Sequence, residues 1–135
     1  MRAVVLEADI IPGADELLPI LQRLGVKVAV LATGEHAAWL EGKPLRDFVH
    51  TVVVSESRSI DPVKRGLTQA MESLEALPHQ TVVVSSRVLD IMTGKEGGVA
   101  KTVGVDVGNA NPLALQAAGA DHIITDMPSL LDVLE

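Results

Sequence analysis

The sequence predicts an α/β domain with a doubly wound, mostly parallel sheet and helices on both faces, similar to a Rossmann fold. Two observations carry this prediction. Strand-like and helix-like segments alternate six times with short connections, which is typical of parallel sheets with helical crossovers. Several strand-like runs consist of apolar or β-branched residues without interruption, as in Thr81 to Val84, which indicates burial on both faces. A chain of 135 residues is expected to form a single domain, residues 1–135.

The composition excludes several classes of protein. The chain is 47% hydrophobic and 21% charged, and Trp39 and Phe48 are its only aromatic residues, so we expect an aliphatic core. A net charge of −7 without a Lys/Arg run argues against nucleic acid and anionic membranes as partners. The absence of Cys excludes disulfides and thiolate sites and fits a cytoplasmic protein. The first residues show neither a signal peptide nor a membrane span, so a cytoplasmic location is expected.

The expected strands are short apolar runs bounded by turn residues. The third of them is either a strand or a short helix that leads into one. In chain order the strands are Arg2 to Leu6, Val26 to Leu31, Phe48 to Val54, Thr81 to Val84, Thr102 to Val105 and His122 to Ile124.

The expected helices have apolar residues at spacings of three and four. The first opens near Pro12 and Gly13, ends at Gly25 and places Leu17, Ile20, Leu21 and Leu24 on one face. A weaker helix covers Glu35 to Leu40. The next runs from Pro62 to Pro78 with an apolar face of Val63, Leu67, Ala70, Met71, Leu74 and Leu77. Three more are expected: one up to Gly97 with Val88, Ile91 and Met92 at helical spacing, one from Pro112 to Gly119, and one over Ser129 to Leu134.

Polar residues follow most of the strands, and a parallel sheet gathers them at one edge. They are Glu7, Asp9, Thr33, Gly34, Ser55, Ser85, Ser86, Asp90 and Asp106. Carboxylates and hydroxyls are hard oxygen ligands, suited to Mg²⁺ and a phosphate bound beside it. The alternative is that they cap helices and fill turns, as Ser, Thr and Asp commonly do. Arg87 either binds an anion at a helix start or is a solvated surface residue.

Other chemistries find little support in the spacing. The four histidines, His36, His50, His79 and His122, are not spaced as metal ligands. Ser85 and Ser86 stand at a strand-to-helix turn but lack the flanking glycines of a nucleophile elbow.

The order of segments resembles the haloacid dehalogenase superfamily, in particular β-phosphoglucomutase-like members without a cap domain. The likeness rests on PGADELLPILQRLGVKVAVLATG, on TVVVSSRVLDIMTGKEGG, and on Gly-Ala-Asp121 followed by a short strand and Asp126. It implies that Glu7 and Asp9 occupy the Asp-x-Asp positions of nucleophile and general acid/base. It further implies that Thr33 binds phosphate and that Asp9 and Asp90 are the candidates for a metal site. Gly34, Ser85, Ser86 and Arg87 are candidates to bind the same phosphate because of their places at strand ends and at a helix start.

The catalytic motifs of that family are altered at three positions. Glu7 replaces the nucleophilic Asp and extends the carboxylate by one methylene, and a misplacement of about 1 Å can cost a hundredfold in rate. Asp61 stands at the position of the family's Lys, which neutralises the transferred phosphoryl group. Lys64, one helical turn further, is a possible substitute for that Lys. Ser86 replaces a metal-binding Asp, which lowers the expected Mg²⁺ affinity.

Two interpretations follow from these changes. The first is a noncatalytic domain that binds a phosphorylated ligand or a protein partner. This case is similar to the noncatalytic N-terminal domain of mycobacterial trehalose-6-phosphate phosphatases. The second is a weak or rewired Mg²⁺-dependent phosphatase acting through Asp9, Asp90, Thr33 and Lys64, with Glu7 as an unusual nucleophile. The apolar surplus further leaves room for a homodimer.

Overall fold

The computed structural model describes residues 3–7, 17–32, 48–54, 60–106, 112–125 and 129–134. At Glu7, at residues 60–64 and at Leu134 it describes the backbone only. The expected helix over Glu35 to Leu40 and the start of the first expected helix lie outside these ranges.

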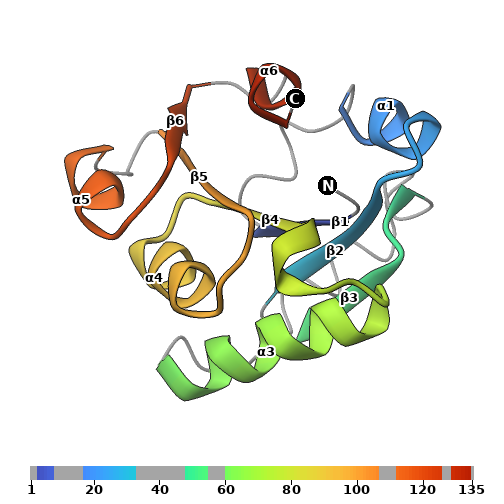
Figure 1. Ribbon diagram of the computed structural model, residues 1–135, viewed down its shortest axis with the longest axis horizontal. Helices are drawn as coiled ribbons and strands as arrows, with labels where there is room; N and C mark the ends of the chain where they lie inside the picture. Colours follow the sequence, from blue (N-terminus) through green and yellow to red (C-terminus); the bar gives the residue numbers. More distant parts are fainter. Residues whose placement is uncertain are drawn as a thin grey trace.

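The described strands form a six-stranded sheet in the order β3-β2-β1-β4-β5-β6 (Figure 1). They are β1 (Ala3–Glu7), β2 (Lys27–Ala32), β3 (Thr51–Val54), β4 (Thr81–Ser85), β5 (Lys101–Val105) and β6 (His122–Ile124). Every neighbouring pair is parallel, which confirms the predicted α/β class and its doubly wound arrangement. All residues of β4 are buried, as the uninterrupted apolar run predicts for a central parallel strand.

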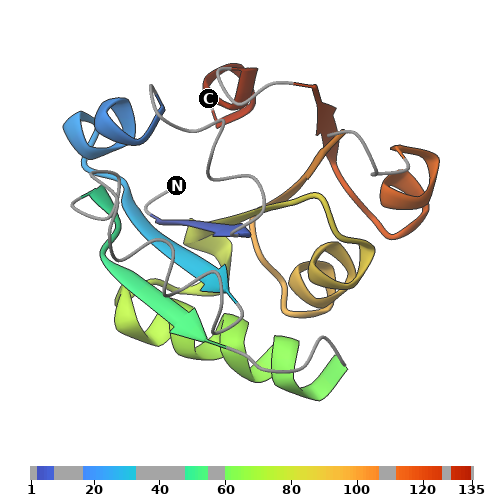
Figure 2. The same cartoon turned by 180° about the vertical axis from the view of Figure 1, so that it is seen from behind.

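Helices cover both faces of this sheet (Figures 1 and 2). Helices α1 (Leu17–Arg23) and α6 (Leu130–Leu134) lie on one face, whereas α3 (Ile60–Ser73) and α4 (Val88–Glu96) lie on the other. Helix α5 (Pro112–Ala117) contacts β5 and β6. A short 3-10 helix, η3 (Pro78–Gln80), leads directly into β4.

The core consists of two aliphatic layers, one on each side of the sheet. Val4 and Leu6 of β1 join the layer under α1 and α6, whereas Ala3 and Val5 join the layer under α3. Successive strand residues point to opposite faces, so one short strand supplies both layers. Each fully buried Val or Leu contributes on the order of 1.5–3 kcal/mol relative to an exposed side chain.

Four residues that the helical spacing placed among the apolar positions of a helix are exposed, and in each case the end or the rotation of the helix is the reason. Leu24 is 65% exposed and Leu77 is 56% exposed, because α1 ends at Arg23 and α3 ends at Ser73. Val88 and Met92 are also exposed, because α4 turns Ile91 and Gly94 toward the sheet. Gly25, at which the first helix was expected to end, has a positive φ of 76°, as is typical of a glycine that follows a helix C-terminus.

The boundaries of β4 and β5 differ slightly from the prediction. The fourth strand continues through Ser85, although the sequence suggested that this hydroxyl residue ends the run. The fifth begins at Lys101. Among the described helices, none is long and apolar enough to cross a membrane.

Candidate functional site at the carboxyl end of strands β1 and β4

The two central strands mark the place where a ligand is expected. Strands β1 and β4 pair directly, with Leu6 beside Val84. From β1 the sheet continues through β2 to β3, and from β4 it continues in the opposite direction through β5 to β6. Such a reversal is the topological switch point, where open α/β sheets bind ligands beyond the carboxyl ends of the strands. Glu7 ends β1 and Ser85 ends β4 at this point.

A buried hydrogen-bond relay organises the turn after β4. The Arg87 backbone N–H donates to Ser85 Oγ at 2.9 Å, and Ser85 Oγ–H donates to Asp90 Oδ2 at 2.7 Å. Ser85 is 1% exposed and Asp90 is 2% exposed. The direction of both bonds is set by chemistry, because a backbone N–H only donates and a carboxylate only accepts. The relay therefore joins the last residue of β4 to the first turn of α4.

The position of Asp90 is electrostatically favourable. It lies in the first turn of α4, where the unpaired N–H groups of the helix stabilise negative charge. The 2.7 Å between Ser85 Oγ and Asp90 Oδ2 is an ordinary distance for an O–H···O hydrogen bond. Ser86 and Arg87 connect β4 to α4, and both are half-buried. Ser86 forms a bend, and Arg87 is the residue before α4.

The remaining predicted site residues are only partly placed. Asp9, Thr33 and Gly34 lie outside the described residues. Lys64 and Asp61 belong to the start of α3, without a described side chain. The structure thus brings Ser85 and Asp90 into contact and sets the backbone of Glu7 on the neighbouring strand.

The donor chemistry of this turn suits Mg²⁺ in kind. Asp90 offers a carboxylate and Ser85 and Ser86 offer hydroxyls, and Mg²⁺ prefers oxygen donors. Within the described ranges no group of three or more His, Cys, Asp or Glu residues is placed to hold a metal ion. The turn over 85–90 itself supplies one carboxylate, that of Asp90.

A second hydroxyl–carboxylate cluster lies near the opposite, amino-terminal end of the sheet. Asp121 Oδ2 accepts the Thr102 backbone N–H at 2.9 Å and lies 3.3 Å from Thr102 Oγ1, while Lys95 Nζ lies 3.2 Å from Asp121 Oδ1. Thr102 Oγ1–H also donates to the Gly119 carbonyl at 2.9 Å. In the sequence, Gly119-Ala-Asp121 was identified only as part of the family resemblance. Its spacing did not indicate that Gly119 and Asp121 contact Thr102 and so connect β5 to the segment before β6.

These contacts shift the acidity of Asp121. Partial burial alone would raise the pKa of its carboxyl. The hydrogen bonds from the Thr102 backbone and from Lys95, with the charge of Lys95 and the Thr102 hydroxyl, outweigh burial and lower the pKa below its ordinary value of 3.8. The carboxylate of Asp121 is accordingly ionised at neutral pH as a structural ligand of Thr102.

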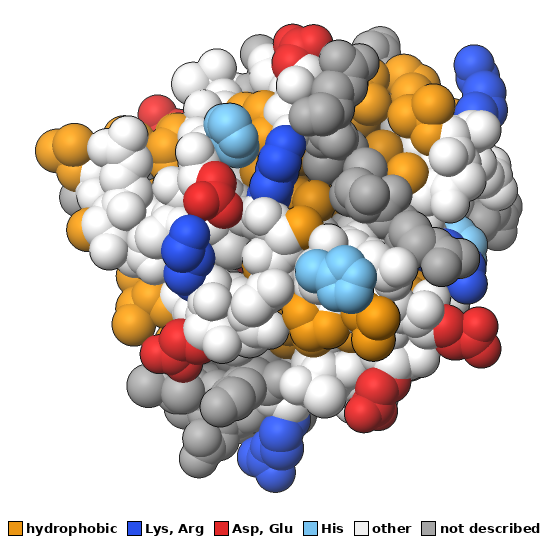
Figure 3. Space-filling view, in the orientation of Figure 1, with side chains coloured by type: hydrophobic (Ala, Val, Ile, Leu, Met, Phe, Trp, Pro, Cys, Tyr) orange, Lys and Arg blue, Asp and Glu red, His pale blue; other side chains and the backbone are white. Residues whose placement is uncertain are grey.

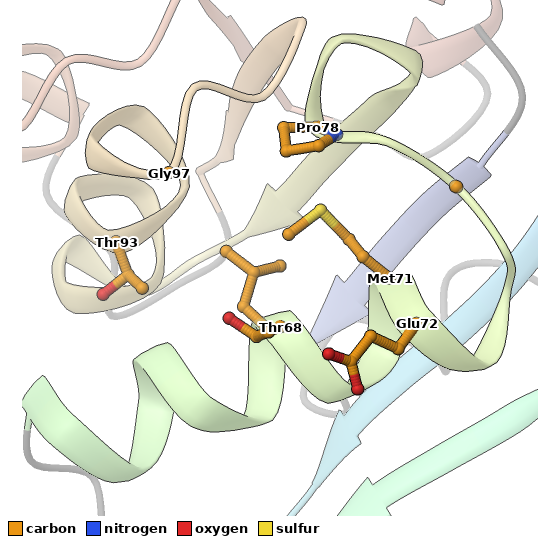
Figure 4. A pocket seen from close by; sticks show the side chains of 8 residues that line it. Thr68, Met71, Glu72, Pro78, Thr93 and Gly97 are labelled. Carbon is orange, nitrogen blue, oxygen red and sulfur yellow. The ribbon is translucent and has the colours of Figure 1, made fainter.

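A groove of about 270 Å³ lies between α3 and α4 (Figure 4). Its wall is mostly apolar and includes Leu67, Met71 and Pro78, with Thr93 from α4 and Glu72 from α3 at its borders. It shares no residue with the turn over 85–90. The groove is therefore separate from the candidate site.

Charged side chains are dispersed over the face seen in Figure 3. Lys and Arg residues alternate there with Asp and Glu and do not gather into a basic patch. The described residues on this face therefore form no basic path of the kind that follows a phosphate backbone.

A protein-family comparison identifies the superfamily. The model described as haloacid dehalogenase-like hydrolase matches residues 1–98. The chain belongs to the haloacid dehalogenase-like hydrolase family. The match runs from β1 through α4, so it includes both strands of the switch point and the turn that holds Asp90.

The chain is also similar, at low sequence identity, to individual phosphatases. The chain is 28% identical over 131 residues to the glyceraldehyde 3-phosphate phosphatase of Pyrococcus furiosus, covering 93% of this chain and 54% of the relative. It is 27% identical over 126 residues to the pyrophosphatase PpaX of Halalkalibacterium halodurans, covering 90% and 58%. A solved structure of a predicted phosphatase from Clostridium acetobutylicum shares the fold with a TM-score of 0.77 at 22% identity, covering 90% and 58%. The chain thus spans little more than half the length of these relatives.

Proposed function

We propose that this domain hydrolyses phosphoric monoesters with the help of Mg²⁺, through a rewired version of the haloacid dehalogenase site. The observation that carries the proposal is the family match over residues 1–98, since it covers the switch point between β1 and β4. The relatives named above support the phosphatase class, and the buried Asp90 supports a retained carboxylate at that switch point.

In this proposal Glu7 is the nucleophile and Asp9 is both the general acid and the general base. The carboxylate of Glu7 attacks phosphorus and forms an acyl phosphate, while Asp9 gives a proton to the leaving oxygen. Water then attacks the acyl phosphate, with Asp9 as the base, and releases inorganic phosphate and free Glu7. Thr33 and Gly34 bind phosphate oxygens, and Lys64 supplies the positive charge that Asp61 does not.

The turn after β4 divides its work between neighbours. Because Ser85 is buried and donates its proton to Asp90, we assign the phosphate contact to Ser86 and Arg87. Asp9 and Asp90 would hold Mg²⁺, which supplies charge stabilisation for the transferred phosphoryl group. The substrate class is a small phosphorylated molecule, and nucleic acid is not an expected partner.

A second candidate function is noncatalytic binding of a phosphorylated ligand or a protein partner. It is favoured by specific residues: Glu7 lengthens the nucleophile, Asp61 reverses the expected positive charge, and Ser86 removes a carboxylate. Catalysis of phosphoryl transfer consists largely of positioning and charge stabilisation. Losses at all three positions weaken both.

Hydrolysis of an aryl phosphate with and without Mg²⁺ distinguishes the two functions. We expect slow, Mg²⁺-dependent turnover that Asp9→Asn abolishes and that the double variant Glu7→Asp, Ser86→Asp increases. A silent wild-type protein with an active double variant would instead favour the noncatalytic domain. If both are silent while inorganic phosphate still shifts the thermal unfolding midpoint, the domain binds phosphate without hydrolysing it.

A further inference from the structure

Ser85 is the last residue of β4, and the structure shows what its side chain does. A glycine at this position has no hydroxyl with which to contact a carboxylate. In this chain Ser85 Oγ–H donates to Asp90 Oδ2 at 2.7 Å, and both residues are almost completely buried. The contact is thus a property of this chain's own residues.

The hydroxyl is itself held in one orientation. Its oxygen accepts the Arg87 backbone N–H at 2.9 Å with one of its two lone pairs, while its proton is donated to Asp90 Oδ2. Ser85 ends β4 and Asp90 belongs to α4, so the hydrogen bond joins two regular elements. A side chain fixed from both sides can in turn fix the rotation of the carboxylate that it contacts.

We propose that Ser85 is a positioning residue that sets the orientation of the Asp90 carboxylate toward Mg²⁺. This inference rests on the proposed function only in taking Asp90 as a metal-binding residue. A carboxylate offers about four lone-pair sites on its two oxygens, so one hydrogen bond on Oδ2 leaves the negative charge in place. Ser85 then offsets part of what the neutral Ser86 costs the site.

Partners of this kind, which orient a metal-binding side chain, change metal affinity about 10- to 100-fold when they are removed. Ser85→Ala is the direct test, because it removes the hydroxyl and keeps the strand residue small. Thr93→Val is the matched control. Thr93 is a buried residue of α4 whose hydroxyl donates to the Leu89 carbonyl at 2.8 Å, so its loss deletes a hydroxyl bond in the same helix without touching Asp90 Oδ2.

The experiment follows two NMR signals of the whole chain and needs no turnover. In wild type we expect a slowly exchanging Ser85 hydroxyl proton, lost in Ser85→Ala and in Asp90→Ala but retained in Thr93→Val. Titration with Mg²⁺ should move the carboxyl-carbon signal of Asp90 with an affinity about tenfold weaker in Ser85→Ala and unchanged in Thr93→Val.

Equal Mg²⁺ affinity in wild type and Ser85→Ala overturns the inference, and so does an Asp90 signal that does not respond to Mg²⁺ in wild type. The proposed function fails separately. A chain whose Asp90 responds to Mg²⁺ through Ser85, but which hydrolyses no aryl phosphate, retains the positioning residue without the activity.

Discussion

The molecule contains two clusters built from the same groups, a hydroxyl and a carboxylate, and they serve different ends of the sheet. In the first, Ser85 and Asp90 are five residues apart and close a turn at the carboxyl end of β4. In the second, Thr102 and Asp121 are 19 residues apart and join the start of β5 to the approach to β6. The residue types are nearly identical, whereas their places in the fold are opposite.

Burial and charge separate the two clusters further. Asp90 is 2% exposed, whereas 34% of the Asp121 side chain is exposed and a Lys lies beside it. Asp121 is satisfied by a strand N–H and an ammonium group, as expected of a structural tie. Asp90 lies at the topological switch point, where open α/β sheets bind their ligands. Position relative to the sheet, more than residue type, therefore separates a candidate site from a structural tie.

The strongest way to test this distinction is to remove each carboxylate in turn. Asp121→Ala leaves the N–H of the fully buried Thr102 without its acceptor. We expect the free energy of unfolding to fall by about 1–3 kcal/mol, with turnover per folded molecule unchanged. Chemical denaturation measures the first quantity, and the aryl phosphate assay measures the second.

Asp90→Asn provides the contrast to that variant. It retains an oxygen acceptor for Ser85, so we expect a smaller loss of stability together with loss of the Mg²⁺ response. The distinction between the clusters breaks down if Asp121→Ala abolishes activity in protein that is still folded.

Removing the hydroxyl of the structural cluster should have the next largest effect. Thr102→Val keeps the side-chain shape and deletes the donor to the Gly119 carbonyl, so we expect a loss of about 1 kcal/mol. Thr93→Val, which deletes a hydroxyl bond within α4, is the matched control and should cost less, because its acceptor Leu89 belongs to the same helix. Thermal unfolding of the two variants side by side gives the comparison, and equal losses would mean that the tie between β5 and β6 adds nothing.

Acid titration should separate the charge of Asp121 from its hydrogen bonds. Because the folded state lowers the pKa of this carboxyl, ionised Asp121 stabilises the fold above its unfolded pKa, close to 3.8. That contribution is lost as the pH falls through the lower folded pKa. We expect wild type to be more stable than Asp121→Asn at neutral pH and the difference to shrink below about pH 3.8. Denaturation at several pH values tests this, and a constant difference would assign the effect to geometry alone.

The sequence predicted the architecture because the central strands carry an unambiguous signal. The run from Thr81 to Val84 reads as a strand buried on both faces, and the structure places it beside β1 at the centre of the sheet. Helical periodicity, in contrast, misplaced Leu24 and Leu77. The apolar spacing continues past the residue at which each helix ends, and both side chains are exposed. Periodicity identifies an element more reliably than its last turn.

The candidate site was predictable only as a location. Strand ends placed Ser85 and Asp90 at one edge, and the structure adds that their side chains bond directly. Spacing does not reveal which partner a hydroxyl chooses, because Ser at a turn can contact several backbone groups as well as a carboxylate. The contact between Thr102 and Asp121 could not be predicted either, because helix α5 lies between the two residues in the sequence.

The smallest expected effect concerns the ion pair of the structural cluster. Lys95→Ala removes the ammonium group that lies 3.2 Å from Asp121 Oδ1, but more than half of the Lys95 side chain is exposed. Exposed pairs contribute about 0–1 kcal/mol and weaken with salt, so we expect a loss of about 0.5 kcal/mol or less that disappears at high ionic strength. Urea denaturation at low and high salt measures this loss of stability. Lys101→Ala is not a suitable control, because Lys101 Nζ donates to the Val133 carbonyl. A loss as large as that of Asp121→Ala would show that Lys95, and not the Thr102 backbone, holds the carboxylate in place.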